Sequence, residues 1–213
     1  CQQPLHLSAK QYQCANRHSF DIAREGYVNL LPVQHKNSKD PGDNKDMMQA
    51  RRDFLHAGWY APLAQAVSDT VTKLAPDTLL DLGCGEGYYS GQIQQARPEL
   101  QLYGVDISKA AIKAAARQYP AIRFAVASSY QLPFAATSFD AILRIYAPSL
   151  DAELCRVLAD GGVLLSVSPA PEHLQQIKAA LYPQVRLHSD DVIAISGLKH
   201  IKRQRLSFQL QLP

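Results

Sequence analysis

The sequence predicts an α/β fold, in which a doubly wound, mostly parallel sheet follows a small module that carries potential metal ligands. Two observations support this prediction. From about residue 60 onward, short apolar runs of strand length alternate with amphipathic stretches of helical spacing. The first of these runs, 78–82, leads directly into the glycine-rich turn Gly83-Cys84-Gly85-Glu86-Gly87. With 213 residues, 46% of them hydrophobic, the chain is long enough for one such domain and a small appendage.

The residues before the sheet predict two helices. A polar stretch, 34–46, contains the turn tetrapeptide 40–43, and a helix is expected from about 46 to 57. This helix should stop at Gly58, in the position after a helix where glycine is favoured. The second helix opens with Pro62 in its first turn, where proline is tolerated. Helical spacing predicts that one of its faces covers the sheet, namely Leu63, Ala66, Val67, Val71 and Leu74.

The rest of the chain predicts alternating strands and helices. The run 78–82 is followed by a helix near 88–96 and a strand at 101–105. Ser108 is expected to cap an alanine-rich helix that extends to about Tyr119. The remaining elements are expected in this order: strands near 122–126, 139–145 and 162–168, a helix near 172–181, and a strand near 203–211.

The first two strands predict a binding site for a nucleoside that carries a positive charge. Gly83 and Gly85 let the backbone approach a ligand closely, and Asp106, at the end of the second strand, suits the two hydroxyls of a ribose. The turn lacks the G-x-G-x-x-G spacing that seats a pyrophosphate, and Asp81 would repel phosphate but attract an ammonium group. S-adenosylmethionine satisfies both conditions. Asp106 has an alternative role as a cap of the strand end.

The first 18 residues contain potential zinc ligands. Cys14 and His18 stand four residues apart, and zinc commonly takes two such pairs. Cys1 would be the second member of a C-x-x-C pair whose first cysteine precedes residue 1. The expected ligands are therefore Cys1, Cys14, His18 and that preceding cysteine. His6 suits the two-pair geometry less well. The alternative is an ordinary terminal cysteine and a core histidine.

Composition excludes several other classes of protein. The net charge of +3 permits an anionic partner without requiring one. No apolar stretch approaches the roughly 18 residues of a membrane span, and the start does not look like a signal peptide. The four cysteines are unevenly spaced, which is not typical of a disulfide framework. A reduced, cytoplasmic compartment is therefore expected.

The glycine-rich turn and three later segments together resemble the class I (Rossmann-like) S-adenosylmethionine-dependent methyltransferases. The later segments are Gln131-Leu132-Pro133-Phe134, Ser138-Phe139-Asp140 and Asp160-Gly161-Gly162, which resemble the markers of the third, fourth and fifth strands. Sheets of this class end with a seventh, antiparallel strand. Only six strands can be found here, so the C-terminal strand is expected to be missing from this sequence.

Further motifs resemble the bacterial guanine-N1 methyltransferases of large-subunit ribosomal RNA, closest to the Gram-negative branch. They are Cys14 to Asp21, Ala23 to Pro32, Asp40-Pro41-Gly42-Asp43, Met47 to Arg52, and Arg144-Ile145-Tyr146-Ala147-Pro148. The resemblance implies a zinc-binding, RNA-recognition module at 1–33, a loop and linker helix at 34–59, and a methyltransferase domain at 60–213. The implied partner is 23S ribosomal RNA, with one guanine in the loop of hairpin 35 as the methyl acceptor. A monomer and a homodimer are both compatible with the sequence.

The same resemblance implies roles for individual residues. Gly85 and Glu86 would line the cofactor, and Tyr60 and His173 would complete its pocket. Tyr60 could instead simply pack at a helix start, and His173 could be an ordinary solvated residue. Many class I enzymes bind adenine through an acidic residue after the third strand, whereas this chain has Ser128-Ser129 there. A serine hydroxyl or the backbone is expected to serve instead.

The segment after the fourth strand bears on the chemistry. It lacks the Asn/Asp-Pro-Pro-aromatic box of enzymes that methylate exocyclic amines, which favours a ring nitrogen as acceptor. Arg144 could stabilise negative charge at guanine O6, or it could pair with a nearby carboxylate. No general base can be assigned. Candidate RNA contacts are the basic residues of the first 60 positions, several of which would be ordinary solvated side chains: Arg17, Arg24, Lys36, Lys39, Arg51 and Arg52.

Two other functions stay open at this point. The pattern at 132–134 and 139–140 also occurs in methyltransferases that act on quinones and other metabolites. A non-catalytic, zinc-stabilised RNA-binding module would share the N-terminal motif, but the intact glycine turn and Asp106 argue against it.

Overall fold

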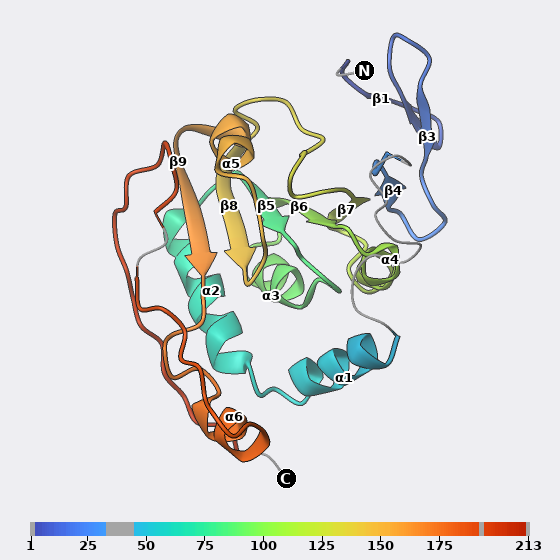
Figure 1. Ribbon diagram of the computed structural model, residues 1–213. Coiled ribbons are helices and arrows are strands. Elements are labelled where there is room, and N and C mark those ends of the chain that lie inside the picture. The colour runs from blue at the N-terminus through green and yellow to red at the C-terminus, as the bar shows by residue number, and fades with distance from the viewer. Residues whose placement is uncertain (1–2, 33–44, 192–193, 212–213) are drawn as a thin grey trace.

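The structure, a computed structural model, describes residues 3–32, 45–191 and 194–211. Figure 1 shows a central sheet with helices packed around it and a separate small sheet near the N-terminus. The small sheet is antiparallel, in the order β1-β2-β3, and the central sheet has the order β4-β7-β6-β5-β8-β9. All strand pairs of the central sheet are parallel, which confirms the predicted α/β class. The strands are β1 (His6–Ser8), β2 (Gln11–Gln13), β3 (Ser19–Asp21), β4 (Val28–Asn29), β5 (Thr78–Leu82), β6 (Gln101–Asp106), β7 (Arg123–Val126), β8 (Phe139–Ile145) and β9 (Leu158–Val167).

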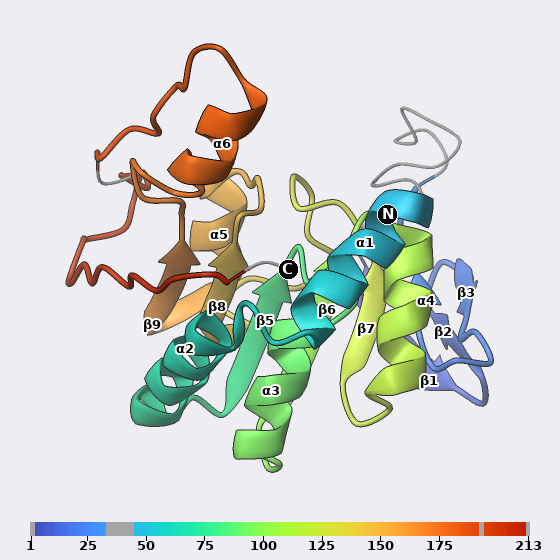
Figure 2. The ribbon, with the colours of Figure 1, turned by 90° about the horizontal axis from the view of Figure 1, so that it is seen from below.

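The helices cover both faces of the central sheet (Figure 2). In β5, Leu79 packs in the same cluster as the apolar residues of α2, α3 and α4, whereas Leu80 and Leu82 pack on the opposite face with α5. Because successive side chains of a strand point to opposite faces, a strand covered on both faces has apolar residues on both, as Leu79, Leu80 and Leu82 do here. The helices are α1 (Lys45–His56), α2 (Ala61–Leu74), α3 (Tyr88–Ala96), α4 (Lys109–Gln118), α5 (Asp151–Val157) and α6 (Gln175–Leu181). None of the helices in the described ranges combines the length and apolar character needed to cross a bilayer.

Most of the expected local signals operate as predicted. The hydroxyl of Ser108 accepts a hydrogen bond from the backbone N–H of Ala111 at 3.3 Å, which caps α4. Gly58 follows α1 with a φ of +82°, a conformation in which glycine avoids strain. One expectation for α2 was wrong: Leu74 is 39% exposed because the helix ends at this residue and Ala75 turns away in a left-handed conformation. The turn expected at 40–43 lies outside the described residues.

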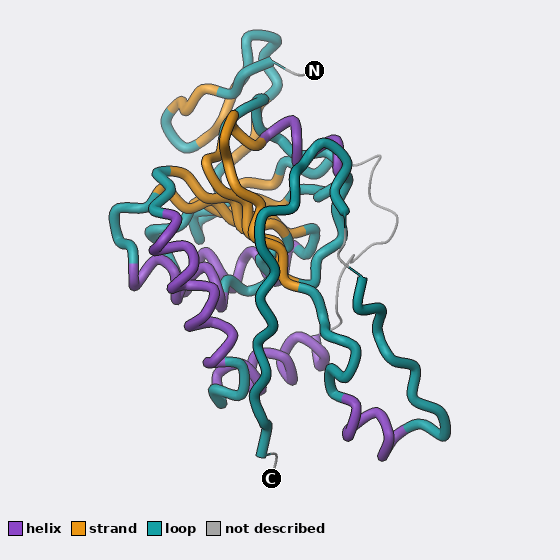
Figure 3. Tube along the Cα trace, turned by 90° about the vertical axis from the view of Figure 1, so that its left-hand side faces the viewer, coloured by secondary structure: helices purple, strands orange, loops and turns teal. Residues whose placement is uncertain are grey.

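The strand expected near 203–211 is not formed. The described part of this segment is loop, and Figures 1 and 3 show it running past β9 toward the C-terminus. Its alternating apolar residues still face the core, since Phe208 and Leu210 pack against the buried cluster of α2. The alternation of apolar and polar residues therefore predicted correctly that one side of this segment is buried. It could not show whether the backbone would pair with a neighbouring strand.

The strand that completes six in the central sheet comes instead from the N-terminal segment. Val28 and Asn29 pair with Ala125 and Val126 of β7, and Tyr27 and Leu31 are buried on either side of this short strand. The small β1–β3 sheet is therefore anchored to the edge of the central sheet. The division at residues 33 and 59 stays a prediction, and the central sheet extends across its first boundary.

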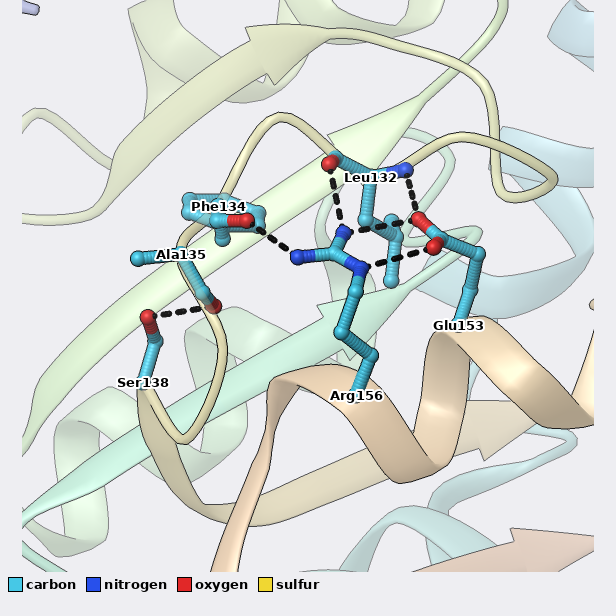
Figure 4. A network of polar contacts seen from close by, with 6 residues as sticks. All are labelled: Leu132, Phe134, Ala135, Ser138, Glu153 and Arg156. Atoms are coloured by element: carbon cyan, nitrogen blue, oxygen red, sulfur yellow. Dashed lines mark hydrogen bonds and ion pairs between the residues drawn. The ribbon is translucent and has the colours of Figure 1, made fainter. Parts of the chain in front are cut away.

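The segment before β8 is held by a polar network on α5, a helix that the sequence did not predict (Figure 4). The guanidinium of Arg156 donates to the carbonyls of Leu132 and Phe134 at 3.0 and 2.7 Å and pairs with Glu153 at 2.7 Å. Glu153 also accepts the backbone N–H of Leu132 at 2.6 Å. Residues 132–134, which resemble a family marker, thus have a structural role. Leu132 is buried, and its backbone is hydrogen-bonded to side chains of α5.

Replacing Arg156 with alanine is expected to lower the free energy of unfolding by about 2 kcal/mol, because two backbone carbonyls and one carboxylate lose their donor. Denaturant unfolding measures this change. A suitable control is Arg205→Ala, which removes an ion pair with Glu172. The side chains of Arg205 and Glu172 are 59% and 50% exposed. Such exposed pairs contribute little, so the control should change stability by less than about 0.5 kcal/mol. Equal losses in the two variants would contradict the structural role of Arg156.

Candidate functional site

One cavity of about 520 Å³ opens where β5, β6, β7 and β8 end. In parallel sheets, the carboxyl ends of the strands form the usual ligand-binding edge. All seven residues that were predicted to bind the cofactor line the cavity. They come from the α1–α2 connection, β5, the glycine turn, β6 and the segment after β9, and they are Tyr60, Asp81, Gly83, Gly85, Glu86, Asp106 and His173. The structure brings these residues together, and their roles toward a ligand stay predictions.

Asp106 lies at the end of β6 and joins two elements of the cavity. One of its carboxylate oxygens accepts the backbone N–H of Gly85 at 3.0 Å, and the other accepts that of Ser108 at 2.8 Å. Both donors are backbone N–H groups, and the same carboxylate residue forms part of the cavity wall. The role as a cap and the role as a ligand for ribose are therefore compatible.

The glycine turn is shaped by close contact at one position and by open space at another. A side chain at Gly83 would place its Cβ 2.5 Å from the Cβ of Ala147, so the turn packs directly on the segment that follows β8. At Gly85, where φ is +55°, a Cβ would meet no atom within 4 Å. This open space on the cavity wall is where a bound nucleoside could contact the backbone, which fits the expected cofactor.

Asp81 is a buried carboxylate at the floor of the cavity. It is 3% exposed and accepts a hydrogen bond from the hydroxyl of Ser90. Burial, together with the nearby charge of Asp106 and partly offset by the Ser90 hydroxyl, raises the pKa of Asp81 to about 7. An ammonium group of a ligand would favour the ionised form and lower this pKa again.

Affinity for S-adenosylmethionine is therefore expected to depend on pH through Asp81. Below about pH 7 the free protein holds Asp81 protonated, so binding of the ammonium group must release a proton, and affinity should fall as much as about tenfold per pH unit. Above that pH the dependence should vanish. Titration calorimetry in buffers of different ionisation enthalpy measures both quantities. In Asp81→Asn the proton release and the pH dependence below 7 should both disappear; if they persist, another group titrates.

The same shift predicts how the stability of the ligand-free protein changes with pH. An unfolded aspartate ionises near pH 3.8, whereas folded Asp81 stays protonated up to about pH 7. Between these values the folded state binds the additional proton, so the contribution of Asp81 to the free energy of unfolding falls as pH rises and levels off above about 7.

Glu86 is held by Arg52, which was predicted from the sequence as an RNA contact. Its carboxylate accepts two hydrogen bonds from the guanidinium of Arg52, at 2.8 Å and 2.5 Å. This bidentate pair fastens α1 to the glycine turn, and the role of Arg52 as an RNA contact stays a prediction. The pair spans 34 positions, so the local pattern carried no signal of it.

Tyr60 and His173 meet across 113 positions of sequence. The tyrosine hydroxyl lies 3.4 Å from Nε2 of His173, and the two rings meet edge to face. Tyr60 is only 8% exposed and also packs edgewise on Phe54 and Phe208. It therefore both packs at the helix start and lines the cavity. Burial, with smaller contributions from His188 and Lys178, lowers the pKa of His173, which favours a neutral ring.

Arg144, the catalytic candidate, does not line the cavity. It is 8% exposed and donates to the hydroxyls of Ser149, at 2.8 Å, and Ser166, at 2.9 Å. Within the described ranges it makes no ion pair with a carboxylate either. These contacts tie the segment after β8 to β9. Its role in stabilising guanine O6 stays a prediction without a supporting contact.

Ser128 and Ser129, where the contact to adenine was expected, line the cavity. Two tyrosines of the cavity wall, Tyr130 and Tyr146, were not predicted as site residues. Tyr146 lines the cavity from the segment after β8. The signal for Tyr146 was available, because a residue that directly follows a parallel strand lies at the binding edge of the sheet.

The expected metal ligands lie at the turn between β2 and β3. Sγ of Cys14 is 3.4 Å from Nδ1 of His18, close to the roughly 3.5 Å that separates sulfur and nitrogen ligands on one tetrahedral zinc ion. Cys1 lies outside the described residues. Within the described ranges no three His, Cys, Asp or Glu residues gather around one point, so the structure shows one pair of the expected site.

Comparison with known proteins decides the family. A zinc-ribbon model described as "RlmA, N-terminal" matches residues 1–39, and a model described as "Methyltransferase domain" matches residues 79–162. The 23S rRNA (guanine(748)-N(1))-methyltransferase of Streptomyces fradiae is 34% identical over the whole of this chain, which spans 78% of that protein. The chain belongs to the 23S rRNA (guanine-N1)-methyltransferase family. The resemblance noted in its sequence motifs is thereby confirmed.

Other similarities agree with this family. A Bacillus subtilis protein that is provisionally named a 23S rRNA (guanine-N1)-methyltransferase is 32% identical; the match covers 82% of this chain and 64% of that protein. The plantazolicin methyltransferase BpumL superposes with a TM-score of 0.52 at 18% identity, covering 66% of this chain and 59% of BpumL, which supports the fold. The family confirms the class I fold with its N-terminal zinc ribbon, and with it S-adenosylmethionine and structural zinc as the cofactors.

Proposed function

We propose that the protein transfers a methyl group from S-adenosylmethionine to N1 of a guanine in the hairpin 35 loop of 23S ribosomal RNA. The observation that carries this proposal is the cavity at the carboxyl edge of the sheet, which gathers the glycine turn, Asp106, Tyr60 and His173. The names of the relatives support the RNA substrate.

The cavity residues would divide the binding of the cofactor among them. Asp106 would hold the ribose, and the open space above Gly85 would receive the nucleoside. Asp81 would attract the ammonium group, while Glu86, fixed by Arg52, shapes the turn. Tyr60 and His173 would form the wall on the side of β8 and β9. When bound, S-adenosylmethionine supplies a methyl group on a positively charged sulfur.

Given such a donor, the protein itself mainly positions the reactants and excludes water. The packing of Gly83 on Ala147 places the cofactor turn directly against the segment that follows β8. Neutral guanine carries a proton on N1, which must leave at or before methyl transfer. The absence of an Asn/Asp-Pro-Pro-aromatic box in this segment supports a ring nitrogen over an exocyclic amine.

The N-terminal module would recognise the RNA. Its zinc ion would be held by Cys1, Cys14, His18 and a further cysteine, and zinc would fix the turn between β2 and β3. We place this module at residues 1–33, the linker at 34–59 and the methyltransferase domain from residue 60 onward.

Methyl transfer to an unmodified transcript of the 23S hairpin tests the proposal. With labelled S-adenosylmethionine, the label is expected at N1 of one loop guanine, identified by mass mapping of nuclease fragments. A transcript with that guanine replaced by adenine should accept none. Labelling of another atom, or labelling of a quinone-like metabolite but not of RNA, would overturn it.

A further inference from the structure

We propose that the ring of Tyr146 is the surface on which the target guanine stacks during methyl transfer. This inference rests on the proposed function and adds a specificity-determining residue to it. Tyr146 is the first residue after β8, lines the cavity and is 47% exposed. An aromatic side chain left half open at a ligand site offers a flat face to a flat base.

The backbone of Tyr146 is strained, and burial of its ring does not account for that strain. Its φ is +53°, a left-handed conformation that costs energy in any residue with a side chain and is rarely adopted by aromatic residues. Glycine would take this position without that cost. A strained and half-exposed tyrosine at a cavity therefore indicates a role for the side chain in binding.

The contacts around Tyr146 hold its segment in a single place. Its backbone N–H donates to the carbonyl of Val167 in β9 at 3.1 Å. Arg144, just before it, clamps Ser149, just after it, at 2.8 Å. The ring of His173 lies against the tyrosine ring at a centroid distance of 5.9 Å and an angle of 35°, and His173 also contacts the Tyr60 hydroxyl. Contacts to its backbone and to its ring thus hold Tyr146 in place.

The order of the strands places Tyr146 on the acceptor side of the cofactor. The central strand β5 has β6, with Asp106, on one side and β8, with Tyr146, on the other. If Asp106 and Gly85 hold the nucleoside, the methionine portion lies toward Asp81 and Gly83, at the end of β5. Gly83 of the glycine turn packs against Ala147, which is next to Tyr146. In-line transfer requires the nucleophile to approach the methyl carbon opposite the sulfur, and Tyr146 borders the turn on the β8 side, away from Asp106.

A control tyrosine outside the cavity makes the proposal testable. Tyr182 is 61% exposed, directly follows α6 and does not line the cavity. The variants are Tyr146→Gly, Tyr146→Phe and the control Tyr182→Ala, each in the full chain. The RNA probe is the 23S hairpin transcript with 2-aminopurine at the target position, whose fluorescence is quenched when it stacks on an aromatic ring.

In complexes of the wild-type protein, Tyr146→Phe and Tyr182→Ala, the probe is expected to be quenched, and in Tyr146→Gly it should stay bright. Tyr146→Gly should raise the KM for RNA about tenfold to 100-fold, the range for one stacked base, with the Kd for S-adenosylmethionine unchanged. Its thermal stability should be equal to or higher than that of the wild type, because glycine relieves the strain.

Other outcomes separate the two proposals. If the wild-type protein methylates guanine N1 and Tyr146→Gly does so equally well, the stacking role is wrong and the proposed function stands. The same conclusion follows if the loss in Tyr146→Gly comes with lower stability and weaker cofactor binding, since the ring would then be structural. If the wild-type protein transfers no methyl group to RNA, the proposed function fails, and the stacking role fails with it.

Discussion

Replacing Asp106 with alanine is expected to weaken the binding of S-adenosylmethionine by about 100-fold or more. Two ribose hydroxyls would lose a charged acceptor, and hydrogen bonds to charged groups contribute about 1.5–3 kcal/mol each. The same carboxylate also orders the turn, through Gly85, and the start of α4, through Ser108. Titration calorimetry with the cofactor measures the change, and methyl transfer should fall in proportion at subsaturating cofactor.

Two variants separate the loss of the ligand contact from a loss of structure. Asp106→Asn keeps one acceptor oxygen and should bind with an affinity between those of the wild type and the alanine variant. Asp69→Ala, on the exposed side of α2, removes a carboxylate that accepts a hydrogen bond from Gln65 and does not line the cavity, so it should leave affinity unchanged. Wild-type affinity in Asp106→Ala would place the ribose elsewhere and contradict the proposed cofactor site.

Replacing Cys14 with alanine is expected to abolish stoichiometric zinc binding. Cys14 is 6% exposed, and its sulfur points at the ring of His18 across the turn between β2 and β3. Removing a direct ligand should lower zinc affinity by more than the roughly 10–100-fold that loss of a supporting contact costs. Metal analysis of the purified protein measures the loss, and methylation of the hairpin transcript should decline with it.

Cofactor binding should survive this substitution. The cavity is lined by residues between Arg51 and His173, none of which belongs to the β1–β3 sheet. Asp21→Ala, also on this sheet but carrying no expected metal ligand, is the control and should keep its zinc. If Cys14→Ala keeps one zinc ion per chain, the expected ligand set is wrong. If it loses zinc but methylates RNA normally, the module does not recognise the substrate.

Much of the fold could be predicted because it is encoded by neighbours in the sequence. The run 78–82, the glycine turn and Ser108 act through backbone preference and periodicity over a few residues, and each lies in the structure where it was expected. The position of Asp106 beside the turn follows from the rule that parallel strands end at one edge. Tyr60 and His173 came from resemblance alone, since no local pattern links residues 113 positions apart.

Other features depend on which distant segments pack together, and there the sequence misled or was silent. Alternating residues at 203–211 indicated a strand, yet this segment covers the core without pairing, and the edge strand comes from Val28–Asn29. The pairing of Arg52 with Glu86 and the turning of Arg144 away from the cavity were not visible either. An arginine side chain can donate hydrogen bonds to RNA, to a carboxylate or to a hydroxyl. Only the packing of distant segments decides which of these partners lies within reach.

By itself, then, the sequence determined the type of ligand at the first two strands, because glycines, a strand-end carboxylate and a buried acid act within one turn of chain. Tertiary structure alone decided that Tyr146 joins His173 in the cavity wall across from Asp106. Their rings are in contact because β8, β9 and the segment after β9 converge at one edge of the sheet. This convergence depends on the packing of the whole sheet into the core. Every strand contributes to that packing, and no single motif encodes it.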